Sequence, residues 1–175
     1  MTVKNNHLFC LLYSWLIKLI TAFLPDQKHI MRFRGWLYSF AMKKCGNNFQ
    51  VSAGTKIFCL QNLEVGDNVF IATNVVINAG TSITLEDEVM LGIASILVSG
   101  NHTLNNGSYR FGAMQRSPIV VGKGSWIGAN VTLIAGCNVP PASLIAANSV
   151  VVGKLIESGV YAGIPSKLIK TNVIG

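Results

Sequence analysis

The chain has 175 residues, half of them hydrophobic and 12% charged, with a net charge of +7 at neutral pH. This length suits one domain with an appendage. Residues 1–44 hold seven Lys or Arg against one Asp, a net +6, so the basicity belongs to that segment. Its cations alternate with aromatic residues, which favours an anionic membrane over nucleic acid as the partner.

Residues 1–44 are predicted to form an apolar and basic helical appendage. Leu8–Leu24 contains a single charge, Lys18, but its 17 residues fall short of the roughly 20 that span a bilayer. A thin polar stripe at helical spacing predicts a helix that lies in the membrane interface or under a neighbour: His7, Ser14, Lys18 and Thr21. A helix that merely packs on the end of the next domain stays open, as does a weak signal anchor, whereas a cleaved signal peptide is disfavoured.

Aliphatic residues recur six apart in the second half of the chain, at Val121, Ile127, Leu133, Val139, Ile145 and Val151. A period of six matches neither an α-helix nor an ordinary strand, so it predicts a solenoid with three hexads in each turn of about 18 residues. Earlier series keep the period but slip by two residues between Leu63 and Val65, and again between Ile83 and Leu85. We expect these slips at corners, with the extra residues bulging outward.

The predicted fold class is therefore an all-β solenoid with an α-helical N-terminal appendage. The repeat domain is expected over 45–170, followed by a short tail at 171–175. Residues 103–118 lack the period and are rich in polar and turn residues, which predicts a loop extruded from the solenoid.

The four cysteines show no metal-ligand spacing and are expected as reduced, packed thiols. One histidine, His102, lies in the repeat region, immediately before the predicted loop. A neutral imidazole there can take a proton from a hydroxyl, although a lone histidine is also compatible with a surface role. A zinc hydratase would need several histidines on adjacent coils, so no metal is expected.

Four segments occur in a fixed order: Ser99-Gly-Asn-His102, Arg116-Ser-Pro-Ile-Val-Val-Gly122, Ser125-Trp-Ile-Gly-Ala-Asn-Val-Thr-Leu-Ile-Ala-Gly136 and Tyr161-Ala-Gly-Ile-Pro-Ser-Lys167. With them the chain resembles the hexapeptide-repeat acyltransferases, in particular the maltose/galactoside and polysaccharide O-acetyltransferases. The resemblance implies a left-handed parallel β-helix and a homotrimer. It also implies active sites between subunits, with acetyl-CoA lying along the solenoid edge.

By this resemblance His102 is the general base, and a backbone N–H near Ala129 stabilises the negative charge of the transition state. The residues expected at acetyl-CoA are Trp126, Gly128, Ala129, Ala147, Gly163, Ile164 and Lys167. Gly128 and Ala147 are equally what a tight coil requires. The residues expected at the acceptor are Asn78, Tyr109, Arg110, Met114 and Gln115.

Asn78 and one acidic segment each have an alternative interpretation. Asn78 also suits a corner in the left-handed conformation. The acidic run Glu86-Asp87-Glu88 is interpreted as a solvated corner, with orientation of His102 as its alternative.

The expected function is transfer of an acetyl group from acetyl-CoA to a sugar hydroxyl of a surface polysaccharide or its lipid-linked precursor. The expected location is the cytoplasm, at the surface of the inner membrane. Two alternatives stay open. One is an acetyltransferase for a small soluble acceptor such as a free sugar, an antibiotic or an amino acid. The other is a non-catalytic β-helix scaffold.

Overall fold

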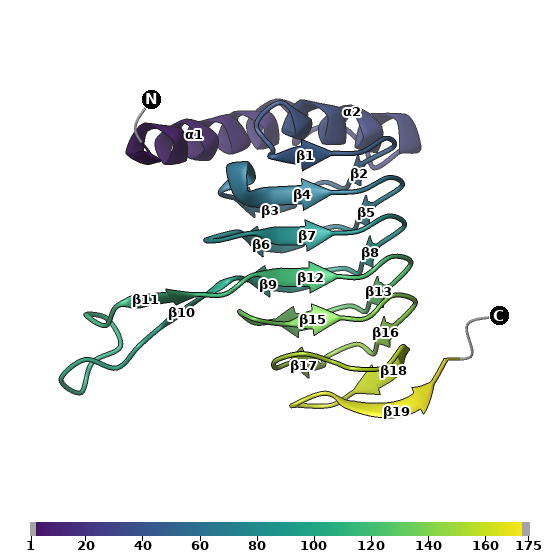
Figure 1. Ribbon diagram of the computed structural model, residues 1–175. Helices are drawn as coiled ribbons and strands as arrows, with labels where there is room; N and C mark the ends of the chain where they lie inside the picture. The colour runs from purple at the N-terminus through teal and green to yellow at the C-terminus, as the bar shows by residue number, and fades with distance from the viewer. Residues whose placement is uncertain (1–2, 173–175) are drawn as a thin grey trace.

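Each hexad of the repeat region forms one short strand, and three strands complete a coil of a left-handed parallel β-helix (Figure 1). Equivalent strands of successive coils pair in parallel, which builds three sheets in this computed structural model of residues 3–172. The first sheet contains β1 (Lys44–Cys45), β4 (Leu63–Val65), β7 (Ile83–Leu85), β12 (Ile119–Val121) and β15 (Asn138–Val139).

The other two sheets form the remaining sides of the triangle. The second contains β2 (Gln50–Val51), β5 (Phe70–Ile71), β8 (Met90–Leu91), β13 (Trp126–Ile127), β16 (Leu144–Ile145), β18 (Gly159–Ala162) and β19 (Lys167–Thr171). The third contains β3 (Lys56–Phe58), β6 (Val76–Asn78), β9 (Ile96–Val98), β14 (Thr132–Leu133) and β17 (Val150–Val151). At the end of the second sheet, β19 runs antiparallel to its neighbour β18.

The aliphatic residues of the hexads form the core, as the period predicts. Ile71, Leu91, Ile127 and Ile145 succeed one another along the second sheet and are fully buried. The corresponding residues of the other two sheets are buried as well. Each coil contributes one strand to each sheet, so these residues stack on the equivalent residues of the coils above and below.

The two-residue slips fall at one corner of the triangle, between the third and first sheets. Leu63 pairs with Ile83 and Ile83 with Ile119, whereas later coils repeat after 18 residues, as Val121 pairs with Val139. The first coils therefore hold 20 residues. Their extra residues do not all bulge outward: Leu60, in the 3₁₀ turn η1 (Leu60–Asn62), is fully buried.

The remaining corners turn through residues in the left-handed conformation. Asn48 and Asn68 occupy the corner between the first and second sheets, and Asn74, Asn130 and Asn148 the corner between the second and third. Asparagine tolerates this backbone region better than most residues. Asn78 is not among the positive-φ residues, because it ends strand β6, so its alternative interpretation as a left-handed corner is wrong.

Two helices close the N-terminal end of the solenoid: α1 (Val3–Thr21) and α2 (Lys28–Ser39) lie across its first coils (Figure 1). The Ser14 hydroxyl donates to the Ile57 carbonyl at 2.7 Å. Buried Arg34 pairs with Asp26 at 2.5 Å and also donates to the carbonyls of Val51 and Thr21. The turn between the helices is thereby fixed to the solenoid. We call these two helices the cap.

No helix within residues 3–172 combines the length and apolarity that crossing a bilayer requires. All four cysteines are free thiols, with Cys10 and Cys137 buried. Of the expected tail, residues 173–175 lie outside the described residues.

Candidate active site

The segment after β9 leaves the solenoid as a hairpin rather than as an irregular loop. Strands β10 (Gly100–His102) and β11 (Met114–Arg116) pair antiparallel and form an arm that slopes away from the cap (Figure 1). We call residues 100–116 the arm, and the corner between the third and first sheets, from which it leaves, the arm edge.

Buried Ser99 holds the base of the arm. Its hydroxyl accepts from the Thr81 N–H and lies 3.0 Å from the Thr81 carbonyl, one coil away. Its carbonyl accepts from the Ser117 N–H at 3.1 Å, which closes the arm where it returns to the solenoid. Further out, the Thr103 N–H and hydroxyl both donate to the Ala113 carbonyl. The arm is thus a bonded hairpin on a fixed base.

His102 lies exposed on the arm and lines an open cavity of about 620 Å³ together with Tyr109, Arg110 and Phe111. The Arg110 guanidinium lies 5.9 Å from the centre of the Phe111 ring. All four lining residues come from the arm itself. An imidazole, a phenol and a guanidinium in one open cavity can hold a polar acceptor and accept its proton.

The ladder of the arm decides which residues share the face of His102. His102 pairs with Met114 and Asn101 with Gln115, so Gln115 projects from the opposite face. Arg116, which was not expected as a site residue, shares the face of Met114, and its Nε lies 3.5 Å from where a Cβ on Gly80 would be. Asn78 lies one coil away, where its carbonyl accepts from the Ser99 N–H. Of the five residues expected at the acceptor, Asn78 therefore lies at the arm edge, and the other four lie on the arm itself: Tyr109, Arg110, Met114 and Gln115.

The residues expected at acetyl-CoA gather along a different corner, between the second and third sheets. Ala129 and Ala147 stack there, because the Asn148 N–H donates to the Ala129 carbonyl at 3.0 Å. On the next coil, the Gly163 carbonyl accepts from the Val150 N–H, and exposed Ile164 follows it. We call this corner the alanine edge. Trp126 projects half-exposed from β13 just before it, and Lys167 begins β19.

The small residues at the alanine edge also serve packing. A Cβ on Gly128 would lie 2.6 Å from the Ile145 carbonyl oxygen, too close for any side chain. The coil thus requires Gly128 whether or not a ligand binds. By contrast, the N–H of Ala129 makes no hydrogen bond within residues 3–172.

One full side of the triangle, the third sheet, separates the arm edge from the alanine edge within a chain. The structure therefore brings Tyr109 and Arg110 into one cavity with His102, whereas Asn78, Met114 and Gln115 do not line that cavity. The acetyl-CoA residues gather at the other edge, apart from the acceptor residues of the same chain.

The acidic run lies at the remaining corner, between the first and second sheets. The Asp87 carboxylate accepts from the Asp67 N–H and the Glu86 carboxylate from the Lys123 N–H, each at 2.8 Å. Glu88 lies 3.7 Å from the Lys123 ammonium. These contacts confirm the interpretation as a corner and exclude the alternative in which the run orients His102. Within residues 3–172, no three His, Cys, Asp or Glu side chains gather as a metal site would require.

Comparisons with known proteins agree with this architecture, although no protein-family model matches the chain. A Saccharomyces cerevisiae protein provisionally named an acetyltransferase, YJL218W, is 30% identical over 126 residues, which cover 72% of the chain but only 64% of the yeast protein. Escherichia coli WbbJ, provisionally named a lipopolysaccharide biosynthesis O-acetyl transferase, is 27% identical over 87% of the chain and 83% of its own length.

Two solved structures share the fold. Galactoside acetyltransferase in complex with coenzyme A has a TM-score of 0.84 and 22% identity, over 98% of this chain and 84% of that one. A Vibrio cholerae hexapeptide-repeat acetyltransferase complexed with acetyl coenzyme A has a TM-score of 0.82 and 24% identity, over 93% and 87%. The chain thus shares the left-handed β-helix of hexapeptide-repeat acetyltransferases and is similar in sequence to proteins named as acetyltransferases. A galactoside O-acetyltransferase of Escherichia coli, 28% identical over 62% of the chain and 54% of its own length, is among these relatives.

Proposed function

We propose that this chain is an acetyl-CoA-dependent O-acetyltransferase that modifies a sugar hydroxyl, with His102 as the general base. The observation that carries the proposal is the exposed His102 on the arm, in one cavity with Tyr109 and Arg110, in a chain related to acetyltransferases. The alternative of a non-catalytic scaffold gives no reason for this group of side chains.

In the proposed reaction, the His102 imidazole takes the proton of the acceptor hydroxyl while the hydroxyl oxygen attacks the carbonyl carbon of the thioester. The Ala129 N–H donates to the negative charge that develops on the carbonyl oxygen, a contribution of about 3 kcal/mol in comparable sites. When the carbon–sulfur bond breaks, the imidazolium returns the proton to the departing thiolate. The products are the acetyl ester and free CoA, and His102 is again neutral.

We further propose that the active site forms between subunits of a homotrimer. The support is the third sheet, which separates His102 from Ala129 within one chain. A neighbouring subunit that presents its alanine edge to this arm edge would unite the two halves. Trp126, Gly128, Ala147, Gly163, Ile164 and Lys167 would then hold acetyl-CoA opposite the partner's arm.

For the acceptor, we propose a sugar of a surface polysaccharide or of its lipid-linked precursor. WbbJ, a relative across most of its length, carries a name from lipopolysaccharide biosynthesis. On the chain itself, residues 1–44 supply a basic and apolar appendage to the domain at 45–170. We propose a cytoplasmic protein that binds the inner-membrane surface through that appendage. Asn78, Tyr109, Arg110, Met114 and Gln115 are proposed to contact the acceptor, with Gln115 on the far face of the arm.

The test is release of free CoA thiol from acetyl-CoA, measured with a panel of sugars and polysaccharide extracts. His102→Ala should lower acceptor-dependent release by about 100-fold or more. It should still bind CoA in calorimetry, since the alanine edge is untouched. His29→Ala, which removes an exposed histidine of α2, is the matched control and should retain full activity. Equal release by wild type and His102→Ala would overturn the role of His102, and failure of both proteins to bind CoA would favour the scaffold.

A further inference from the structure

Helix α1 packs with its polar side inward and its apolar side outward. The residues it buries against the solenoid are mostly small or polar: Cys10, Ser14, Ile17 and Thr21. The residues on the opposite side are large, apolar and exposed: Leu8, Phe9, Leu12, Trp15, Leu16, Leu19 and Ile20; exposed Phe23 follows the helix. A surface helix normally shows the reverse arrangement. The outer side of α1 therefore lacks an apolar partner within residues 3–172.

Helix α2 continues the same surface with aromatic rings. It buries Met31, Arg34, Gly35 and Tyr38 against the solenoid. On its outer side the rings of Phe33 and Trp36 stack at 5.9 Å between centroids, and Trp36 meets Phe40 edge-on at 4.8 Å. All three are exposed. We call the outer residues of α1 and α2 the cap face. Exposed apolar side chains gathered in this way mark interaction sites rather than an ordinary solvent-facing surface.

The charges around the cap face are basic. Lys18 and Lys28 are exposed beside it, and Arg32 is half-buried at its border. The single acid of the segment, Asp26, is already engaged by buried Arg34 and by the Ala53 N–H at 2.8 Å. An apolar face with Trp and Phe, bordered by cations, is the pattern of helices that lie in the interface of an anionic membrane.

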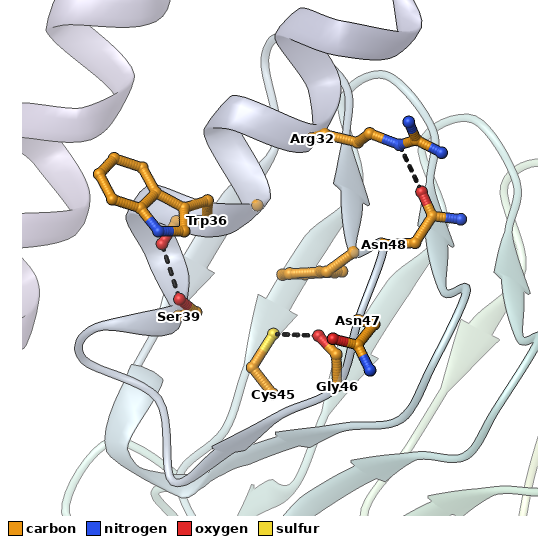
Figure 2. A pocket seen from close by; sticks show the side chains of 9 residues that line it. Arg32, Trp36, Ser39, Cys45, Gly46, Asn47 and Asn48 are labelled. Atoms are coloured by element: carbon orange, nitrogen blue, oxygen red, sulfur yellow. Dashed lines mark hydrogen bonds between the residues drawn. The ribbon is translucent and has the colours of Figure 1, made fainter.

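Figure 2 shows how this border is built. A cleft of about 430 Å³ lies between α2 and the first coil, with Arg32 at one side and Trp36 at the other. The Arg32 Nε donates to the Asn48 amide oxygen at 2.6 Å, and the Asn48 amide donates to Asn68 at 2.8 Å. These bonds hold the guanidinium against the first coil, across the cleft from Trp36. A cation held at the rim of the cap face is suited to the phosphate of a lipid headgroup.

We infer that the cap face docks on a bilayer containing anionic lipids, with α1 and α2 flat in the interface and the solenoid axis upright. This inference rests on the membrane association proposed above and assigns the surface that makes it. Both helices lie across the end of the solenoid (Figure 1), so one plane can contact both. A second copy docked face to face would bring two basic borders together, and their repulsion disfavours that occupant.

An upright solenoid keeps the acceptor site away from the lipid. The arm follows the third coil, so two strand spacings and the thickness of the helices place its base roughly 20 Å from the bilayer surface. From there the arm slopes further away (Figure 1). A sugar attached directly to a lipid phosphate is too close to the membrane to reach His102. The acetylated sugar must lie further along a lipid-linked glycan.

Flotation with vesicles tests the docking. The full chain should float with phosphatidylcholine vesicles that contain phosphatidylglycerol, and less with phosphatidylcholine alone or at high salt. Leu12→Glu combined with Leu19→Glu should reduce the bound fraction at least tenfold. Ile156→Glu, at an even more exposed apolar residue on the distant part of the solenoid, is the matched control and should bind as wild type does.

The three tryptophans test the orientation. Vesicles made with brominated phosphatidylcholine should quench Trp15 and Trp36, which belong to the cap face. They should leave Trp126 bright in a Trp15→Phe/Trp36→Phe variant that still floats. Quenching of Trp126 would overturn the upright orientation. Flotation unaffected by the two glutamates would overturn the docking face.

The remaining outcome separates this inference from the proposed activity. Mass doubling in light scattering that the two glutamates abolish, without vesicle binding, would show that a second copy covers the cap face and would refute lipid docking. CoA release with a soluble acceptor should be the same in the Leu12→Glu/Leu19→Glu variant as in wild type. An inactive wild type that still floats would refute only the proposed activity.

Discussion

The solenoid and the cap treat apolar residues in opposite ways. In the coils, every repeated aliphatic from Val51 to Val151 is buried, and Ile127 is 0% exposed. In the cap, α1 turns Leu12 outward at 56% exposure and Trp15 at 60%, while the buried Ser14 bonds the solenoid. In the coils, the repeated apolar residues mark the buried core. In the cap, the large apolar residues of α1 mark an exposed surface that a partner can cover.

Core truncation should separate the two regions most strongly. Ile127→Ala removes a fully buried side chain between Leu91 and Ile145 and should lower the free energy of unfolding by about 4 kcal/mol. Leu19→Ala, an apolar truncation on the cap face, should change it by less than about 0.5 kcal/mol. Denaturant unfolding measures both values. A comparable loss at Leu19 would show that the cap face is covered in solution.

Removal of Asp26 should loosen the cap without unfolding the coils. Asp26→Ala leaves the Arg34 guanidinium buried without its partner, which should cost about 3 kcal/mol, given that Asp26 is partly exposed. Limited proteolysis should then cut near residues 22–28. Glu88→Ala, which breaks an exposed ion pair with Lys123, is the control and should leave the digestion pattern unchanged. Cleavage within the coils of Asp26→Ala would mean that cap and solenoid unfold together.

Cys45 lies at the junction of the cap and the first coil, so its reactivity tests how closely the two pack. Burial first, and then the Asp67 carboxylate, raise the pKa of the Cys45 thiol to about 11 from an ordinary 9.0. At pH 8 its thiolate fraction is therefore about 100-fold lower than that of an ordinary thiol, because each pKa unit is a factor of ten. Alkylation by iodoacetamide should be slow and should accelerate as the pH rises toward 11. Fast alkylation of Cys45 at pH 8 in the folded protein would contradict this raised pKa and the partial burial that causes it.

The coils were predictable because the three-strand turn of the solenoid sets both the six-residue period and the burial of the repeated aliphatic residues. A residue every six positions must face inward if three strands make a turn, so Val121 to Val151 could be assigned from spacing alone. The slips could be placed at a corner, but the sequence could not show that both fall on the arm edge or that Leu60 packs inward. Handedness came from the family resemblance, not from the period.

The site was predictable only in part. The missing period at 103–118 indicated an extrusion, but β11 gave no signal because a three-residue ladder outside the core has no apolar alternation. Arg116 was missed for the same reason, since its shared face with Met114 exists only once the hairpin pairs. The direction of α1 could not be inferred either, because a helix apolar on most sides does not reveal which side is covered.

The arm interrupts the sequence without interrupting the stack. Ile83 pairs with Ile119 across it just as Leu63 pairs with Ile83 one coil earlier. The arm is an insertion that leaves the register of the solenoid unchanged: the coil that stops at Ser99 continues from Ser117. Changes in the arm are therefore free of the packing constraints that hold Gly128 in place at the alanine edge. The two halves of the proposed site can thus diverge at different rates, with new acceptor specificities arising on a donor edge that stays the same.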